Sequence, residues 1–206
     1  MSPKLAKESL RLKDRVVLST FGLLSRGKGI EYAIEALPQV LKDRPEILYL
    51  IIGETHPEVR KREGEEYRQF LFDLVASLGL EKNVRFVNRF LPENELINYL
   101  QATDICIIPY PDREQISSGT LTYALSTGKA VVTTPFLHAE EAISNGAALE
   151  CGFKDPDSIA ECVNTLLKDK QVHQTLSRMA YEYSRPMIWP NVAMRYVNVF
   201  YHALGL

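Results

Sequence analysis

Short apolar segments alternate along the chain with longer segments in which apolar residues recur at helical spacing. Most of the short segments are apolar almost throughout and rich in β-branched residues, which is typical of strands covered on both faces of a parallel sheet. Six such segments are present, the last being the weakest: 16–21, 47–52, 84–87, 105–108, 130–134 and 147–150. The pattern therefore predicts a parallel sheet of about six strands.

The segments between these strands have the period of amphipathic helices. Apolar positions lie on one helical stripe in four stretches: 30–41, 70–78, 96–100 and 159–167. Gly79 is a natural end for the second helix, and Asp155 followed by Pro156 is a strong start for the fourth. Pro38 is expected to kink or shorten the first helix. Strand–helix alternation from Arg15 to Lys168 predicts one doubly wound, Rossmann-like α/β domain with right-handed crossovers.

Helical periodicity continues beyond this alternation without another strand. The last predicted helix places Trp189, Tyr196 and Phe200 on or near one face. An aromatic face of this kind is covered either by the chain's own sheet or by a partner or further domain, and the pattern leaves both alternatives open. We therefore divide the chain into a lead-in over 1–14, an α/β domain with flanking helices over 15–184, and a C-terminal helix over 185–206.

Charge excludes some classes of function. The chain has 206 residues, with 24 Lys and Arg against 26 Asp and Glu and a formal net charge of −2. A dedicated nucleic-acid-binding protein would carry a basic excess or a basic stripe. No apolar stretch approaches the roughly 18 residues of a membrane span, and the polar start of the chain does not have the pattern of a signal peptide. We expect no nucleic-acid partner and no transmembrane segment.

Cysteine and histidine usage gives no metal site. Cys106, Cys151 and Cys162 are odd in number and lack the spacing of zinc ligands. The four histidines show no ligand-like spacing either. This usage is typical of a reducing compartment, so we expect a cytoplasmic protein with no metal and no other cofactor.

The first candidate site is the loop between the first strand and the first helix. In an open parallel sheet, ligands bind beyond the carboxyl ends of the strands. The loop Gly22–Gly29 contains three glycines and brings Arg26 and Lys28 to a helix N-terminus, where backbone N–H groups and the helix dipole favour an anion. The glycine spacing matches neither the dinucleotide fingerprint nor the P-loop. The alternative is a flexible turn with solvated cations.

The second candidate site is the loop that follows the fourth strand. It leads into a helix through Ser117, Ser118, Gly119 and Thr120. Ser117 or Ser118 is a plausible N-cap, and the four residues together offer more N–H and hydroxyl groups than capping requires. These groups would suit a phosphate. Helix capping alone is the alternative.

The order and spacing of these segments resemble a known family. The family's Gly-Arg-Leu-x-x-x-Lys-Gly is similar to the segment Gly22–Gly29, and its Ala-Asp-Ile junction is similar to Ala102–Ile105. Its Glu-Ala-x-Ala-x-Gly-x-Pro-Val-Val is similar to the helix that leads into Gly128–Thr134. The chain thus resembles, over nearly its whole length, the C-terminal, nucleotide-sugar-binding half of the retaining group 1 glycosyltransferases of the GT-B fold.

The resemblance implies roles for several residues. Lys28 matches the lysine that contacts the donor's pyrophosphate, and Gly22 matches the glycine that opens this motif. The helix start at Ser117–Thr120 matches the segment whose amides hold the phosphates and stabilise the leaving nucleoside diphosphate. Leu23 stands where the family has an arginine, and Arg26 could supply a guanidinium instead.

The family's two glutamates, eight positions apart, fall on other residue types here. Their positions correspond to Gln115 and Tyr123. Glu114, one place away, could take the first role. The second glutamate commonly holds the ribose, so Tyr123 at this nucleotide-binding position implies altered nucleotide affinity or base preference.

The resemblance leads to a first hypothesis and two alternatives. The first is the donor-binding domain of a glycosyltransferase that moves a sugar from a UDP-sugar or GDP-sugar to an unknown acceptor, with retention. The parent would need an N-terminal domain that is missing here, and any association with the inner membrane would run through that domain. This chain is then expected to fold and not to transfer sugar alone. The alternatives are a non-catalytic nucleotide-binding or assembly module and a sugar-nucleotide epimerase domain.

Overall fold

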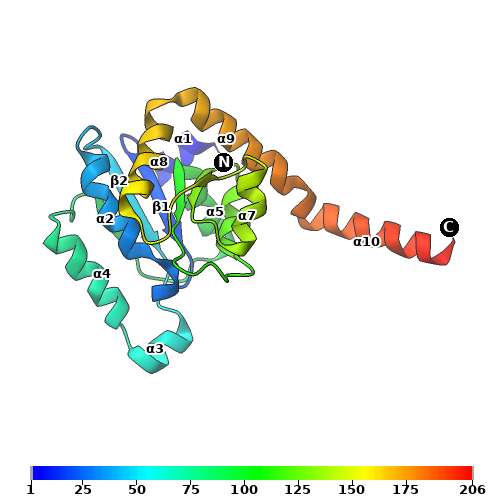
Figure 1. Ribbon diagram of the computed structural model, residues 1–206, viewed down its shortest axis with the longest axis horizontal. Coiled ribbons are helices and arrows are strands. Elements are labelled where there is room, and N and C mark those ends of the chain that lie inside the picture. Colours follow the sequence, from blue (N-terminus) through cyan, green and yellow to red (C-terminus); the bar gives the residue numbers. More distant parts are fainter. Residues whose placement is uncertain (1, 206) are drawn as a thin grey trace.

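The computed structural model describes residues 2–205 and confirms the doubly wound parallel sheet (Figure 1). Within this range the sheet has six parallel strands in the order β3-β2-β1-β4-β5-β6. The strands are β1 (Val16–Phe21), β2 (Ile47–Ile52), β3 (Val84–Val87), β4 (Ile105–Ile108), β5 (Ala130–Thr133) and β6 (Leu149–Glu150). The first four match their predicted segments, β5 is one residue shorter than expected, and β6 is reduced to two residues.

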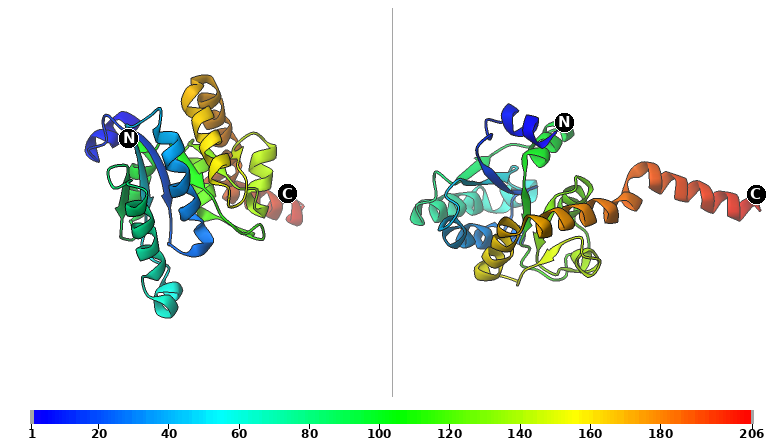
Figure 2. Two further views of the ribbon diagram at one scale, coloured as in Figure 1. Left: turned by 60° about the vertical axis from the view of Figure 1, so that its left-hand side comes forward. Right: turned by 90° about the horizontal axis from the view of Figure 1, so that it is seen from above.

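Helices cover both faces of the sheet (Figure 2). Side chains from one face of the sheet pack with α2 (Ile30–Leu41), α4 (Glu66–Ser77) and α8 (Pro156–Lys168). Side chains from the other face pack with α1 (Pro3–Ser9), α5 (Glu93–Ala102), α6 (Gly119–Ser126) and α7 (Leu137–Ser144). The remaining segments are η1 (Arg26–Lys28), α3 (Pro57–Glu63), α9 (Lys170–Ser184), η2 (Arg185–Met187) and α10 (Trp189–Leu204).

Strand β2 shows why the apolar segments are continuous. Its residues are buried in both directions: Tyr49 and Ile51 belong to the cluster under α2, and Leu50 and Ile52 to the cluster on the opposite face. The polar atoms of these strands are satisfied inside the sheet, as where the Tyr49 hydroxyl donates to Thr20 Oγ1 at 2.6 Å. Burial raises the pKa of Tyr49.

All three cysteines are free thiols. Cys106 in β4 and Cys151 after β6 are buried, and Cys162 in α8 is partly buried. Burial raises the pKa of Cys106 and of Cys162 to about 11, because a thiolate would lose its hydration.

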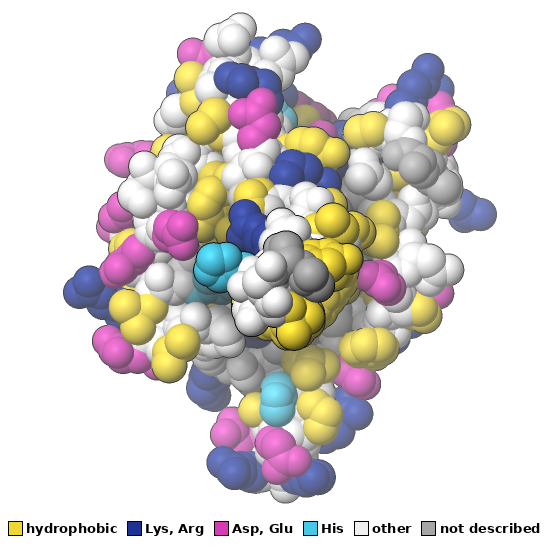
Figure 3. All heavy atoms as spheres, turned by 90° about the vertical axis from the view of Figure 1, so that its right-hand side faces the viewer, with side chains coloured by type: hydrophobic (Ala, Val, Ile, Leu, Met, Phe, Trp, Pro, Cys, Tyr) yellow, Lys and Arg dark blue, Asp and Glu magenta, His cyan; other side chains and the backbone are white. Residues whose placement is uncertain are grey.

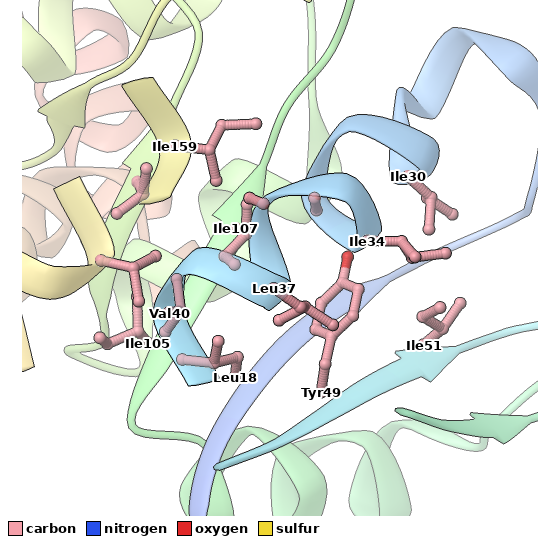
Figure 4. Packing of buried hydrophobic residues seen from close by; sticks show 14 of the residues in the cluster. Leu18, Ile30, Ile34, Leu37, Val40, Tyr49, Ile51, Ile105, Ile107 and Ile159 are labelled. Atoms are coloured by element: carbon pink, nitrogen blue, oxygen red, sulfur yellow. The ribbon is translucent and has the colours of Figure 1, made fainter. Parts of the chain in front are cut away.

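Helix α2 continues through Pro38, so the expected shortening is wrong. The helix runs from Ile30 to Leu41 with the proline inside it. Leu37 and Val40, on either side of the proline, are each 1% exposed and face the sheet (Figure 4). Burial of these side chains favours the helical path even though a proline cannot donate its backbone hydrogen bond.

The predicted lead-in over 1–14 contains a docked helix. In α1, Lys7 Nζ lies 2.6 Å from Asp104 Oδ2 and donates to the carbonyl of Arg15 at 3.0 Å. The same Asp104 oxygen accepts from the backbone N–H of Val17 at 2.7 Å. Ala6 in this helix is fully buried. One carboxylate therefore ties α1 and the start of β1 to the start of β4.

Helix α10 does not pack on the sheet. It projects away from the α/β domain (Figures 1 and 2), and none of its described residues is buried. Trp189 is 84% exposed, and Tyr196 and Phe200 are also exposed. Figure 3, seen from the side toward which α10 projects, shows hydrophobic side chains gathered on it. Of the two alternatives for the aromatic face, packing on the chain's own sheet is therefore wrong.

No helix within residues 2–205 combines the length and the apolar character needed to cross a bilayer.

The strand order places two loops side by side. The direction of winding reverses between β1 and β4, which pair through Leu18 with Ile105 and Ser19 with Cys106. The loops that follow these strands therefore open at the switch point of the sheet, where α/β domains bind ligands.

The burial of α2 gives a direct test of this packing. Leu37→Ala is expected to lower the free energy of unfolding by about 2–5 kcal/mol, since it leaves a cavity between α2 and the sheet. Leu5→Ala, on the exposed side of α1 where Leu5 is 55% exposed, is the matched control and should change stability little. Urea denaturation of both variants measures the difference. Equal losses would contradict the packing described here.

Candidate functional site

Three of the predicted site residues meet where β1 ends. Gly22 follows β1 with a φ of +121°, a conformation that favours glycine. A Cβ placed on it would lie 3.2 Å from Thr120 Oγ1 and 3.9 Å from Lys28 Nζ. Thr120 Oγ1 also donates to the carbonyl of Phe21 at 3.2 Å. The start of α6 and the loop after β1 thus share one small region, as the sequence predicts.

Close backbone contact fixes the position of Lys28. Gly29 separates η1 from α2 and has a φ of +60°. A Cβ on Gly29 would lie 2.0 Å from the carbonyl oxygen of Pro109, the residue that follows β4. The glycine therefore lets the loop after β1 lie directly against the end of β4, which brings Lys28 beside Tyr110.

Tyr110 connects Lys28 with Ser118. Lys28 Nζ donates to the Tyr110 hydroxyl at 2.6 Å, and this hydroxyl lies 3.2 Å from Ser118 Oγ. The Tyr110 ring is 2% exposed and stacks on Phe136, with 4.9 Å between ring centroids. An ammonium has three N–H groups, so Lys28 can also donate to a ligand.

Ser118, one of the two predicted N-caps, caps α6. Its Oγ accepts from the N–H of Leu121 at 3.1 Å, and its own N–H donates to His138 Nδ1 at 2.7 Å. Within residues 2–205, the N–H groups of Gly119 and Thr120 have no hydrogen-bond acceptor. Open space lies beside Gly119, and the first turn of α6 contains no acidic residue. The start of α6 therefore presents two unpaired N–H groups and the positive end of a helix dipole.

Arg26 is directed to a different place from Lys28. Its guanidinium lies over the rings of Tyr67 and Phe70 in α4, 5.5 Å and 5.6 Å from their centroids. The predicted pair of cations is therefore divided between two directions, with Lys28 toward α6 and Arg26 toward α4.

Glu114 and Ser117 lie in the exposed turn that precedes α6. The N–H of Glu114 donates to Asp112 Oδ1 at 2.9 Å, and the carbonyl of Ser117 accepts from Gln115 Nε2 at 2.6 Å. The start of α7 fixes the backbone of this turn, because Leu137 donates its N–H to the carbonyl of Arg113 at 2.9 Å.

Tyr123 lies farther along α6 and faces α5 and the start of α10. Its hydroxyl donates to Glu93 Oε1 at 3.0 Å, and this hydrogen bond raises the pKa of Tyr123. Tyr123 also lines a pocket of about 340 Å³ together with Met187 and Trp189. The position that corresponds to the second family glutamate thus pairs with a carboxylate from the neighbouring helix.

A second, apolar pocket adjoins Gly22. It holds about 90 Å³, and its walls include Leu23, Phe90 and Leu96. Its floor is formed where Gly53, with a φ of +138°, meets Gly22; a Cβ on Gly53 would lie 1.9 Å from the Gly22 carbonyl oxygen. The pocket therefore adjoins the same glycine that borders Lys28.

The sequence does not show how three parts of this site come together. Tyr110 reads as the end of an apolar strand, and His138 lies twenty residues beyond Ser118, so neither shows its partner in the local pattern. The apolar pocket is assembled from three separate loops.

A doubly wound parallel sheet with a lysine and a free helix N-terminus at its switch point has the arrangement of mononucleotide-binding α/β domains. The chain belongs to the family described as glycosyl transferases group 1, whose model matches residues 2–183.

Two relatives show the extent of the sequence similarity. The chain is 25% identical over 189 residues to the lipopolysaccharide 1,2-N-acetylglucosaminetransferase of Salmonella typhimurium, covering 89% of this chain and 48% of the relative. It is 28% identical over 191 residues to the D-inositol 3-phosphate glycosyltransferase of Corynebacterium efficiens, covering 91% of this chain and 43% of the relative. The chain thus spans less than half the length of these relatives.

Solved structures share the fold. Anabaena HepE in complex with UDP superposes with a TM-score of 0.82 at 20% identity, over 99% of this chain and 52% of that one. The C-terminal domain of the group 1 protein LpcC from Francisella tularensis superposes with a TM-score of 0.76 at 20% identity, over 88% of this chain and 90% of that one. The match to an isolated C-terminal domain confirms that the fold is that of the C-terminal half of a GT-B glycosyltransferase.

Two glycines with the same backbone conformation test the contact that positions Lys28. Gly29 has a φ of +60° and would contact Pro109, whereas Gly79 has a φ of +67° and nothing within 4 Å of an added Cβ. Gly79→Ala is expected to cost about 1–2 kcal/mol of stability through its left-handed backbone alone. Gly29→Ala should cost about 1–3 kcal/mol more, because the methyl group overlaps a carbonyl oxygen. Thermal unfolding measures the stability lost in each variant, and equal losses would exclude the close contact between Gly29 and Pro109.

Proposed function

We propose that this chain is the donor-binding domain of a glycosyltransferase that transfers a sugar, with retention, from a UDP-sugar or GDP-sugar to an acceptor bound by another domain. The observation that carries the proposal is the convergence of Lys28 with the unpaired N–H groups of Gly119 and Thr120 at the switch point. Membership in the family supports it. A neighbour of the same fold, Anabaena HepE, was solved with UDP and with UDP-glucose.

The two adjoining regions suit the two parts of a nucleoside diphosphate. The diphosphate would lie between Lys28 and the start of α6, where each donor group can meet a phosphate oxygen. The base would lie in the apolar pocket beside Leu23 and Phe90, which adjoins the same Gly22 backbone. In this scheme the sugar would lie beyond the diphosphate, toward the exposed turn that contains Glu114.

Catalysis in this scheme is electrostatic. When the bond between the anomeric carbon and the β-phosphate oxygen breaks, negative charge grows on the leaving diphosphate. Lys28 and the amides of Gly119 and Thr120 are held in place before this charge develops, which is the condition under which such donors lower a barrier. Ser117 and Ser118 shape the helix start, and Glu114 is proposed to face the sugar. Arg26, stacked over α4, would have to turn to reach the phosphates.

The carboxylate that contacts the ribose is proposed to differ from the family pattern. Tyr123 occupies the position of the second glutamate, and Glu93 lies at its hydroxyl. We assign Tyr123 to the nucleotide-binding surface, with Glu93 as the carboxylate beside it.

The replacement of both family glutamates favours a second candidate, a module that binds nucleotide without catalysis. Sugar transfer by the intact parent, lost in Lys28→Met, would exclude this module.

The exposed helix α10 is proposed to pack toward a second domain of a longer polypeptide. Group 1 relatives are about twice as long as the segment matched here. The aromatic face of α10 has no cover within residues 2–205, so a second domain would bury it and close the donor site. On this proposal the 206-residue chain binds donor but does not transfer sugar alone. Its free thiols are consistent with a cytoplasmic location, which we also propose.

The fluorescence of Trp189 tests whether a second domain covers α10, because Trp189 is the chain's single tryptophan. In the 206-residue chain its fluorescence should be quenched by acrylamide as freely as that of an indole in water. In a longer polypeptide that carries the second domain, quenching should fall as the ring becomes buried. The control is Leu5→Trp in a Trp189→Phe background, since α1 lies on the domain itself and its quenching should not change. Equal quenching of Trp189 in both polypeptides would contradict the proposed contact.

Binding of diphosphates tests the donor site directly. Lys28→Met is expected to weaken binding of UDP or GDP by about 10- to 100-fold, because a hydrogen bond from a charged donor is lost. Binding of the corresponding nucleoside should change little. Lys42→Met, at the opposite end of α2 in an exposed position, is the matched control. Isothermal titration calorimetry measures the diphosphate and nucleoside affinities of the wild-type chain and of both variants; no binding of either diphosphate by the folded wild-type chain at millimolar concentration would overturn the proposal.

A further inference from the structure

We propose that Tyr110 and His138 are positioning residues of the diphosphate site, and that together they determine which donors of Lys28 and of α6 face the ligand. The inference rests on the proposed function, because it assigns roles within that same site. Neither residue is placed in contact with the ligand. Each acts through a hydrogen bond to a group that is placed in contact with the ligand.

Tyr110 sets the direction of Lys28. The ammonium has only donors, so the phenol oxygen accepts from Lys28 Nζ across 2.6 Å. The phenol proton can then point to Ser118 Oγ at 3.2 Å, which leaves the serine proton free to turn toward the ligand. The phenol itself cannot move, because its ring is buried against Phe136 and the Tyr110 carbonyl accepts from Thr134 Oγ1 at 2.7 Å. A rigid phenol thus holds a flexible lysine at one point.

The ring of Tyr110 adds a second restraint on the same cation. Lys28 Nζ lies 4.3 Å from the ring centroid, within the range of cation–π attraction. The hydroxyl bond and the ring contact together restrict the long lysine side chain before any ligand arrives. Restricting it in advance reduces the entropy lost when the ligand binds.

His138 sets the position of the free N–H groups on α6. Its Nδ1 accepts the N–H of Ser118 at 2.7 Å, which requires the imidazole to be unprotonated at Nδ1. The first amide of the helix start is therefore already paired. The first free amides are those of Gly119 and Thr120, and the Thr120 side chain lies beside Gly22, where a Cβ on that glycine would be 3.2 Å from Thr120 Oγ1. The imidazole thus directs an anion toward Lys28 instead of toward the exposed turn.

The backbone of α7 makes this arrangement rigid. The N–H of Leu137 and the N–H of His138 donate to the carbonyls of Arg113 and Gln115 at 2.9 and 3.3 Å. Arg113 also forms an ion pair with Glu140 at 2.9 Å. The first turn of α7 therefore holds the whole turn before α6, and the imidazole of His138 is the contact that reaches the helix start itself.

The test for Tyr110 separates positioning from folding. Tyr110→Phe keeps the buried ring and its stacking but removes the hydroxyl that holds Lys28 and Ser118. UDP affinity of the 206-residue chain is expected to fall about 3- to 30-fold, less than in Lys28→Met because the lysine remains and only its positioning is lost, while uridine affinity and the unfolding temperature stay close to wild type. Tyr99→Phe, a partly buried tyrosine packed against the same hydrophobic cluster, is the control and should bind UDP as wild type does.

The test for His138 uses two substitutions that differ only in the acceptor. His138→Leu removes it, whereas His138→Asn places an amide oxygen close to the position of Nδ1. UDP affinity is expected to fall about 3- to 30-fold in His138→Leu and to recover to within about twofold of wild type in His138→Asn. His56→Leu is the matched control, because His56 Nδ1 accepts a backbone N–H in the same way, from Glu58 at 3.2 Å, at the start of α3. Its UDP affinity should be unchanged.

The outcomes distinguish this inference from the proposed function. If the wild-type chain binds UDP and Tyr110→Phe and His138→Leu bind it equally well, the inference is wrong and the proposed function stands. The inference is also wrong if UDP and uridine weaken together, or if His138→Asn binds as poorly as His138→Leu, since both results indicate a general structural defect. If the wild-type chain binds neither UDP nor GDP, the proposed function itself fails, and the inference fails with it.

Discussion

The sheet is buried on both faces, and this constraint decides where chemistry can occur. A strand between two layers of helices has no place for a solvated polar side chain, so the polar atoms that remain must pair within the sheet, as Thr20 does when it donates to the carbonyl of Ile107 at 2.6 Å. Groups able to meet a ligand are consequently confined to the strand ends. Because the winding reverses between β1 and β4, the loops after these two strands lead to helices on opposite faces of the sheet, which is where α/β domains bind ligands.

Most of the fold could be predicted because buried segments have a recognisable local pattern of apolar residues. Continuous apolar character located the strands to within a residue or two, and Ser118, Gly79 and Asp155 act in the structure as the helix boundaries that their residue types indicate. The grouping of Gly22, Lys28 and Thr120 followed from the rule that parallel strands end at one edge. Each of these inferences depends on residues whose effect is felt within one turn or one strand.

The features that could not be predicted depend on contacts between segments that are distant in the sequence. Arg26 and Lys28 are chemically similar and two residues apart, yet the aromatic rings of α4 attract one and the phenol of Tyr110 attracts the other. Nothing in the loop itself distinguishes them. Helix α1 was also missed, since its docking rests on one buried alanine and on a carboxylate that lies nearly a hundred residues away. The helix continues through Pro38 for the same reason: tertiary burial outweighs a local preference.

The free thiols have a practical consequence for following the motions of this domain. An alkylating reagent attacks the thiolate, and the raised pKa values of Cys106 and Cys162 keep both groups protonated at neutral pH in addition to their being shielded. Cys106 lies in a central strand, so it becomes reactive only when the sheet itself opens, whereas Cys162 is partly accessible beside the short edge strand β6. Under native conditions the labelling rate of Cys106 would therefore report opening of the whole sheet, and that of Cys162 would report opening at its edge. No cysteine needs to be introduced for this measurement.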